Sequence, residues 1–117
     1  MRFIRSVKYA LNGIHNFCLR ERNGQLQIII AVIAVGFGFV LHISAMEWIV
    51  IILCIAAVLS LEMINSSIEK LSDMVKPGFD PQIKIIKDTA AGAVLIAAVA
   101  SLIIGIIIFG NKIISLL

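Results

Sequence analysis

Charged side chains are scarce in this sequence. Only 15% of the 117 residues are charged, whereas 61% are hydrophobic and the mean hydropathy is +1.08. A soluble globular domain has roughly 25% charged and about 45–50% apolar residues. This deficit excludes an ordinary water-soluble enzyme and a disordered chain. It indicates one small integral membrane domain that covers residues 1–117.

Cysteine is also scarce, with only Cys18 and Cys54 in the chain. The two lie at different expected depths, so no disulfide is expected, and two cysteines are too few for a metal framework. His15 and Cys18 lie one helical turn apart, but two unrelated polar residues on a surface helix explain this spacing better than a metal site. The chain has no phosphate-binding glycine loop, dinucleotide fingerprint or Ser-His-Asp arrangement, and we expect no nucleic-acid partner.

In place of charges, the chain has long apolar runs. No charged residue occurs in residues 24–46 or 89–111, and a third apolar run covers residues 48–61. The first two runs exceed the roughly 20 residues that cross a bilayer as a helix. Continuous runs without alternation favour helices over barrel strands. The sequence therefore predicts an all-α membrane protein with transmembrane helices at residues 25–43, 48–75 and 82–109.

Glycine, proline and polar residues mark the expected helix ends. Residues 42–48 are predicted to form a short turn after the first span. Proline and glycine at residues 77–78 end the second span, and glycine and asparagine at residues 110–111 end the third. Gly36 and Gly38 lie within the first span, where small residues favour close helix packing.

Residues 1–20 have the pattern of an amphipathic surface helix, followed by a polar break at residues 20–24. Its apolar residues recur at helical spacing: Phe3, Ile4, Val7, Ala10, Leu11, Ile14, Phe17 and Cys18. Its polar face carries the basic residues Arg2, Arg5, Lys8 and Arg20. A basic amphipathic helix suits the surface of an anionic leaflet.

The distribution of basic residues predicts the orientation in the membrane. Basic side chains cluster before the first span and in residues 70–88, whereas the turn near His42 has none. By the positive-inside rule, the N-terminus and the 70–88 segment face the cytoplasm. The short turn and the C-terminus then face outward, which three spans allow.

A polar stripe interrupts the second predicted transmembrane helix. At ~100° per residue, Glu62, Glu69 and Asp73 fall within ~40° of one another, with Asn65 ~60° to one side. Glu62 should lie ~16 Å along the axis from Asp73. A carboxylate inside the membrane is costly, so it is normally functional or paired. A cation on another helix, or a wetter interface, would also explain Glu62, but a functional carboxylate such as a general base is favoured.

A second polar group is expected at the cytoplasmic interface. Glu21 precedes the first span and Glu69 lies near the cytoplasmic end of the second. Two carboxylates together with phosphate oxygens suit Mg²⁺, which prefers hard oxygen ligands. Lys84, Lys87 and Asp88 share a face at the start of the third helix, where lysines can hold phosphates. By charge alone, an ordinary pair of interfacial lysines explains Lys84 and Lys87 better.

Two segments resemble a known family. Residues 62–73 read E-x-x-N-x-x-x-E-x-x-x-D, and residues 87–94 read K-D-x-A-A-G-A-V. Together they resemble the prokaryotic diacylglycerol kinase family, which includes the undecaprenol kinases of Gram-positive bacteria. The resemblance covers residues 2–106. It implies a homotrimeric helical bundle in the bacterial cytoplasmic (inner) membrane, with a surface helix and three transmembrane helices in each subunit.

The resemblance also implies an activity and a set of site residues. The activity is ATP-dependent phosphorylation of a membrane lipid alcohol, undecaprenol or diacylglycerol. Glu62 would be the general base, Asn65 would orient the reacting groups, and Glu21 and Glu69 would hold Mg²⁺ with the nucleotide phosphates. The remaining positions that match the nucleotide site of the family are Arg2, Tyr9, Asp73, Lys87 and Asp88.

The substrate and the class of protein leave alternatives. Residues 21–23 and 90–92 resemble the undecaprenol-kinase branch more closely, whereas residues 24–27 and positions 80 and 85 depart from common family residues. A small proton-coupled transporter with Glu62 as the proton carrier is the main alternative. Such transporters usually have four spans and an acidic residue in the first, which this chain lacks. A structural, pore-forming peptide would not require the aligned polar stripe.

Overall fold

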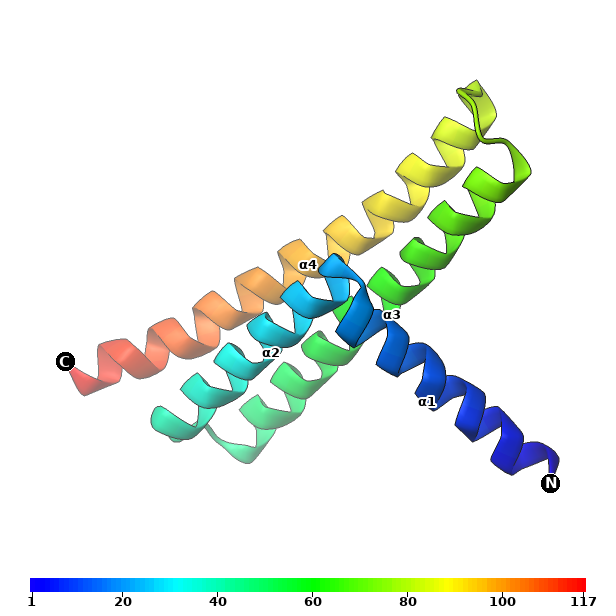
Figure 1. Cartoon of the computed structure of the whole chain (residues 1–117). Helices are drawn as coiled ribbons and strands as arrows, with labels where there is room; N and C mark the ends of the chain where they lie inside the picture. Colours follow the sequence, from blue (N-terminus) through cyan, green and yellow to red (C-terminus); the bar gives the residue numbers. More distant parts are fainter.

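A computed structural model describes all 117 residues as four helices joined by short connections (Figure 1). The helices are α1 (Arg2–Arg20), α2 (Arg22–Val40), α3 (Ala45–Val75) and α4 (Pro81–Leu116). The structure contains no strand, so the all-α prediction is confirmed. Three helices, α2, α3 and α4, are long and apolar enough to cross a membrane. The chain is therefore a multi-pass membrane protein.

The connection between α1 and α2 is shorter than the predicted polar break. Glu21 alone leaves the helical conformation, with φ −97° and ψ 137°. The chain turns sharply here because Gly24, in the first turn of α2, lies directly against the end of α1. A Cβ atom at Gly24 would lie 1.9 Å from the Phe17 carbonyl oxygen. Gly24 therefore allows α1 to leave the bundle at a steep angle, as Figure 1 shows.

The turn between α2 and α3 lies earlier than residues 42–48. Helix α2 ends at Val40 and α3 begins at Ala45. His42 adopts a left-handed conformation with φ 54°, and Ser44 with Glu47 forms a capping box that starts α3. This reciprocal cap satisfies orphan backbone donors, so Glu47 belongs to the helix rather than to the turn.

Only one of the two glycines predicted to allow close packing does so. A Cβ atom at Gly38 would lie 2.7 Å from the Trp48 ring, whereas one at Gly36 would meet nothing within 4 Å. Gly38 therefore lets the Trp48 ring of α3 pack directly on α2. Within the single chain, Gly36 makes no close contact, so its predicted packing role stays a prediction.

Helices α3 and α4 form a long antiparallel hairpin. The loop at residues 76–80 ends with Asp80, whose carboxylate accepts hydrogen bonds from the backbone of Gln82 and Ile83 and caps α4. Pro81 occupies the first turn, where its missing N–H has no effect. This agrees with the predicted break at Pro77 and Gly78, since α3 ends at Val75.

The predicted end of the last helix is wrong, because α4 continues through Gly110 and Asn111 to Leu116. A glycine inside a helix costs only about 1 kcal/mol. Tertiary contacts offset this cost, because Ile108 is buried against α3 and Lys112 forms an ion pair with Glu47 at 3.3 Å. The loss of propensity at two positions is therefore too small to end the helix.

One seam of residues on α3 faces the rest of the bundle. Its buried residues are spaced seven apart: Ile51, Val58, Asn65 and Ser72. A seven-residue period is typical of helices that pack along a left-handed seam. On α4, Val94 and Ile108 are buried. Most other side chains are exposed in the single chain, as expected for a membrane protein whose surface contacts lipid or other subunits.

We use two terms for the ends of the bundle. The basic end contains Glu21 and the 76–80 loop, and the turn end contains residues 41–44 and the C-terminal part of α4. Helix α2 has 19 residues, about 28 Å at 1.5 Å per residue. The hairpin of α3 and α4 extends well past the start of α2 at the basic end (Figure 1). The hairpin tip therefore stands clear of the layer that α2 spans.

Candidate active site

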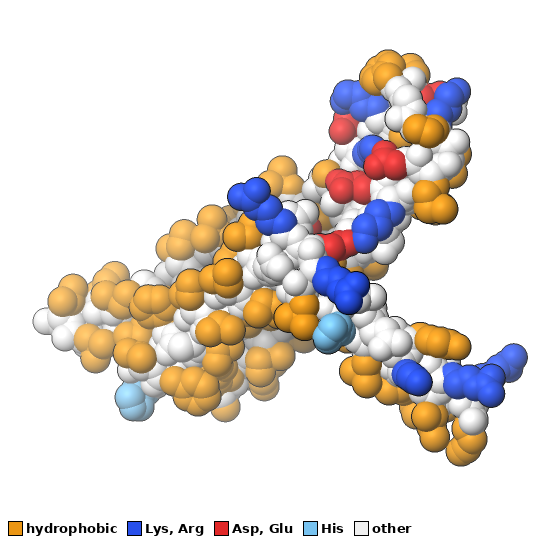
Figure 2. Space-filling view, in the orientation of Figure 1, with side chains coloured by type: hydrophobic (Ala, Val, Ile, Leu, Met, Phe, Trp, Pro, Cys, Tyr) orange, Lys and Arg blue, Asp and Glu red, His pale blue; other side chains and the backbone are white.

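The polar stripe of α3 lies at the basic end of the bundle. Acidic and basic side chains alternate there along the hairpin, whereas hydrophobic side chains cover most of the remaining surface (Figure 2). Glu62 is half-buried and Glu69 is exposed, and neither carboxylate forms an ion pair or a side-chain hydrogen bond within the chain. Both carboxylates are therefore free to contact a ligand.

Glu21 lies beside this stripe, although it is more than 40 residues away in sequence. Ser66 Oγ donates a hydrogen bond to Glu21 Oε2 at 2.7 Å, and Lys70 Nζ donates to Oε1. The hydrogen bonds from Lys70 and Ser66 hold the pKa of the Glu21 carboxyl below its usual range. Glu21 is therefore an ionised carboxylate fixed against α3.

This contact also sets the depth of Glu62. Ser66 is level with the start of α2, and Glu62 lies one helical turn further toward the turn end. Glu62 is therefore only just inside the apolar layer, whereas Glu69 and Asp73 stand on the protruding part of the hairpin.

The two helices of the hairpin carry a second group of paired charges. Lys87 Nζ donates a hydrogen bond to Asp73 Oδ1 at 2.5 Å across the hairpin. Lys84 Nζ contacts Asp88 Oδ2 at 2.5 Å within α4. Three of the predicted nucleotide-site residues, Asp73, Lys87 and Asp88, therefore lie together on the hairpin tip.

Asn65 occupies the buried seam between α3 and α4. Its side chain is only 7% exposed, and its Oδ1 atom has no hydrogen-bond partner in the chain. A buried polar atom without a partner is costly, by about 1–3 kcal/mol. Such an atom three residues from Glu62 is typical of a functional rather than a packing position.

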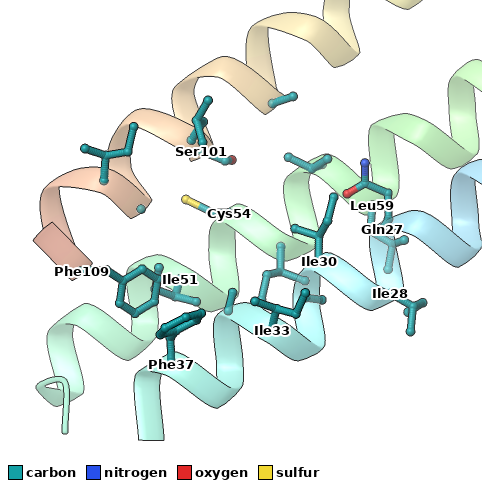
Figure 3. Close-up of a pocket in the computed structure, with 18 residues that line it drawn as sticks. Gln27, Ile28, Ile30, Ile33, Phe37, Ile51, Cys54, Leu59, Ser101 and Phe109 are labelled. Carbon is teal, nitrogen blue, oxygen red and sulfur yellow. The ribbon is translucent and has the colours of Figure 1, made fainter. Parts of the chain in front are cut away.

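An apolar groove lies on the turn-end side of Glu62. The groove lies between α2, α3 and α4 and has a volume of about 600 Å³. Figure 3 shows Gln27 and Leu59 together at one end of it and Phe37 with Phe109 at the other. Val58 and Leu59 line the groove on α3 and precede Glu62 by four and three residues. Residues at these spacings share a helix face, so Glu62 lies on the same side of α3 as Val58 and Leu59, about one turn beyond the lining of the groove.

The structure does not bring Arg2 and Tyr9 to the other site residues. Both lie on α1, which extends away from the hairpin (Figure 1), and Tyr9 is 69% exposed. The other seven predicted residues are on α3, on α4 or at the α1–α2 junction. A single chain therefore assembles only part of the predicted site.

The carboxylates suit a metal that is bound partly by the protein. No group of three His, Cys, Asp or Glu side chains lies close enough to hold a metal ion. Glu21, however, already has a cation, the Lys70 ammonium, against one oxygen. Carboxylate oxygens are hard donors of the kind that Mg²⁺ prefers, and Mg²⁺ usually takes only one or two protein carboxylates beside phosphate oxygens and water.

Sequence reasoning missed Ser66 and Lys70 as partners of Glu21. No motif includes Lys70, which entered the prediction only as one of the cytoplasmic basic residues. Their spacing of four residues does place them on one face of α3, next to the acidic stripe. The sequence does not reveal that Glu21 faces this position, because the turn at Glu21 decides it.

Comparison with known proteins identifies the family of the chain. A sequence model of the prokaryotic diacylglycerol kinase family matches residues 8–109. The chain is 40% identical over 111 residues to the undecaprenol kinase of Bacillus subtilis, covering 95% of this chain and 90% of that protein. It is 34% identical over 101 residues to the diacylglycerol kinase of Synechocystis sp., covering 86% of this chain but only 58% of that longer protein. The chain belongs to the prokaryotic diacylglycerol kinase family.

Proposed function

We propose that this protein is a membrane lipid kinase that transfers the γ-phosphate of ATP to the hydroxyl group of undecaprenol. The observation that carries the proposal is the position of Glu62, a carboxylate without a partner about one helical turn beyond the lining of an apolar groove. A long isoprenoid chain in the groove would place its terminal hydroxyl beside this carboxylate. Glu62 lies at the depth where such a hydroxyl meets water.

In the proposed reaction, Glu62 accepts the proton of the lipid hydroxyl. The hydroxyl oxygen forms a bond to the γ-phosphorus while the bond from that phosphorus to the β–γ bridging oxygen breaks, so that ADP leaves. General-base catalysis contributes about 10²–10⁴ to a rate. Asn65, whose buried Oδ1 has no partner within the chain, orients the reacting groups. Phosphoryl transfer depends mainly on positioning and charge neutralisation, which scattered polar residues can supply.

The nucleotide would bind at the basic end of the hairpin. Lys87 contacts phosphate and Asp88 lies toward the adenosine, with Asp73 beside Lys87. Glu21 and Glu69 would hold Mg²⁺ together with phosphate oxygens. Bound Mg²⁺ would neutralise the charge that develops on the transferred phosphate. The pairing of Asp73 with Lys87 and of Asp88 with Lys84 keeps these side chains in place before the nucleotide binds.

The proposed site is completed by more than one copy of the chain. Arg2 and Tyr9 lie on α1, away from the hairpin of the same chain, so a neighbouring subunit would supply them. A homotrimer would also cover part of the exposed apolar surface of α2, α3 and α4. Sites between subunits are a common result of symmetric assembly and offset the small core of each chain.

The proposed membrane is the bacterial cytoplasmic membrane, with the basic end in the cytoplasm. Nine of the ten Lys and Arg residues lie on α1, at its junction with α2 or on the hairpin tip. The remaining one, Lys112, lies at the turn end and is paired with Glu47. The positive-inside rule then places α1 and the site on the side where ATP is available.

The choice of undecaprenol over diacylglycerol is supported by the relatives. The relative with 40% identity and nearly complete coverage of both chains is named undecaprenol kinase. The 34% relative, named diacylglycerol kinase, is matched over little more than half of its length. Both names are those of kinases, and this favours a lipid kinase over the proton-coupled transporter.

The lipid assignment can be tested with purified protein in mixed micelles that contain Mg²⁺ and labelled ATP. Undecaprenol and diacylglycerol would be offered separately. We expect label in undecaprenol at a rate at least tenfold above that in diacylglycerol. A preference for diacylglycerol would overturn the lipid assignment. The absence of label in either lipid, with folded protein, would overturn the kinase proposal.

A further inference from the structure

Glu21 is held in place by two residues of α3 that the family motifs do not include. Ser66 Oγ donates to Oε2, and Lys70 Nζ donates to Oε1, so both carboxylate oxygens are engaged. The two donors differ in their surroundings. Ser66 is half-buried, whereas the Lys70 side chain is 70% exposed and reaches Glu21 from solvent. The lysine is therefore the partner that can leave without disturbing the packing of α3.

The position of the ammonium conflicts with the metal site of the proposed function. Glu21 would have to offer an oxygen to Mg²⁺, and Oε1 is the atom that Lys70 contacts. An ammonium and a divalent cation on one carboxylate repel each other strongly at contact distance. Lysine is a compact charge on a flexible four-carbon stem, so it can move aside.

We propose that Lys70 is a positioning residue that occupies the place of the metal ion: its ammonium keeps Glu21 aligned when no metal is bound and leaves Oε1 when Mg²⁺ enters with the nucleotide. This inference rests on the proposed function, because it assumes that Glu21 is a metal ligand. In this role Lys70 competes with the metal ion, whereas a phosphate-binding lysine would help to hold the metal–nucleotide complex. Removal of the Lys70 charge tightens metal binding, whereas removal of a phosphate contact would weaken it.

The test measures Mn²⁺ binding, because Mn²⁺ replaces Mg²⁺ at oxygen sites and its free form is detected by electron paramagnetic resonance. Protein in micelles would be titrated with Mn²⁺ and β,γ-methylene-ATP, which cannot transfer its phosphate. An exposed ion pair is worth up to about 1 kcal/mol, which corresponds to about a fivefold change in Kd. We expect Lys70→Gln to bind Mn²⁺ about fivefold more tightly, and Lys70→Arg to bind it like the unaltered protein.

Matched variants separate this effect from a general change in charge. Lys76→Gln removes the same charge from the same hairpin, but Lys76 pairs with Asp80 and not with Glu21. We expect its Mn²⁺ affinity to remain near that of the unaltered protein. If Lys70→Gln and Lys76→Gln change the affinity equally, or if Lys70→Gln weakens it, the proposal for Lys70 is wrong.

A second measurement uses the unaltered protein and avoids any effect of substitution on folding. The acetylation rate of Lys70 by acetic anhydride, read by mass spectrometry, should rise at least twofold when Mg²⁺ and β,γ-methylene-ATP are added, with Lys76 as the internal reference. A constant rate would contradict the release of Lys70. Glu21→Gln separates the two proposals: if it leaves Mn²⁺ binding intact, Glu21 is not a metal ligand and the assignment of the metal site fails first.

Discussion

The two ends of the α3–α4 hairpin use the same helix seam for different purposes. On the side of the turn end, Ile51 and Val58 fill the seam, and Ile51 clusters with Ile43 and Ile108. On the side of the basic end, the same seven-residue spacing brings in Asn65 and Ser72. The packing geometry continues unchanged while the chemistry of the side chains switches from apolar to polar. One pair of helices therefore supplies both an apolar membrane-spanning segment and a polar segment.

An ion pair lies near each end of this hairpin, and the two pairs differ in how exposed their carboxylate side chains are. Glu47 and Lys112 at the turn end are both largely covered and 3.3 Å apart. At the basic end, the Asp73 side chain is 63% exposed although Lys87 contacts it at 2.5 Å. The first pair closes the end of a packed segment. The second differs in its carboxylate, because Lys87 is 35% exposed, close to the 32% of Lys112, whereas Asp73 is open to solvent.

The largest effect is expected from Glu62→Gln, which retains the size of the side chain but removes the proposed base. We expect the rate of undecaprenol phosphorylation to fall by about 10²–10⁴, because an amide cannot accept the hydroxyl proton. The melting temperature in detergent should stay within a few degrees of the original. Labelled-ATP transfer and thermal unfolding would be measured on the same preparation.

The matched change at the other end is Lys112→Gln, which breaks the pair with Glu47. We expect unchanged phosphorylation per folded molecule and a slightly lower melting temperature. A loss of activity in Lys112→Gln comparable to that in Glu62→Gln would mean that the two ends are not functionally distinct.

A smaller effect is expected when the polar side chain of Asn65 in the seam is replaced by an apolar one. Asn65→Leu removes a buried polar atom without a partner, so we expect the free energy of unfolding to rise by about 1 kcal/mol. Activity should fall by about 100-fold, because the reacting groups lose their orientation. Denaturation in mixed micelles and the lipid kinase assay give the two quantities.

Val58→Asn is the reciprocal control, because Val58 and Asn65 are both 7% exposed on the same seam. It buries an amide without a partner, and we expect a loss of about 2 kcal/mol in stability. Equal stability losses in Asn65→Leu and Val58→Asn would show that Asn65 is a packing residue.

The smallest effect is expected for the pH dependence of stability at a helix start. Helix α3 begins at a serine cap, Ser44, whereas α4 begins at an ionisable cap, Asp80. Hydrogen bonds from the backbone of Ile83 and Gln82, with Lys76 nearby, hold the pKa of Asp80 below its usual range. The ionised cap therefore contributes its stability above the pKa of the unfolded carboxyl and loses it as the pH falls through the lower folded pKa. Asp80→Asn keeps a capping oxygen without this titration.

We expect Asp80→Asn to be slightly less stable at pH 7 and to lose less stability than the original protein between pH 5 and pH 3. Melting temperatures across this range provide the measurement. An identical pH dependence in both proteins would assign the acid sensitivity to other carboxylates, with Glu21 as the first candidate because its pKa is also lowered.

The sequence predicted the number, order and approximate limits of the helices. Long runs without charge leave helices as the only way to satisfy the backbone in lipid, so the predicted spans 25–43, 48–75 and 82–109 overlap the observed helices at residues 22–40, 45–75 and 81–116. It also predicted the stripe of Glu62, Asn65, Glu69 and Asp73, because residues on a single helix have fixed angular relations. Such features are local, and local rules suffice for them.

Only the tertiary structure decided which residues meet across helices. The turn at Glu21 and the close contact at Gly24 bring Glu21 to Ser66 and Lys70, which no periodicity indicates. The end of α4 was wrong by seven residues because contacts of Ile108 and Lys112 with α3 outweigh a weak local signal. Where the helices form follows from the low polarity of lipid. Which residues contact each other between helices depends on the turns, and a single residue can change the direction of a turn.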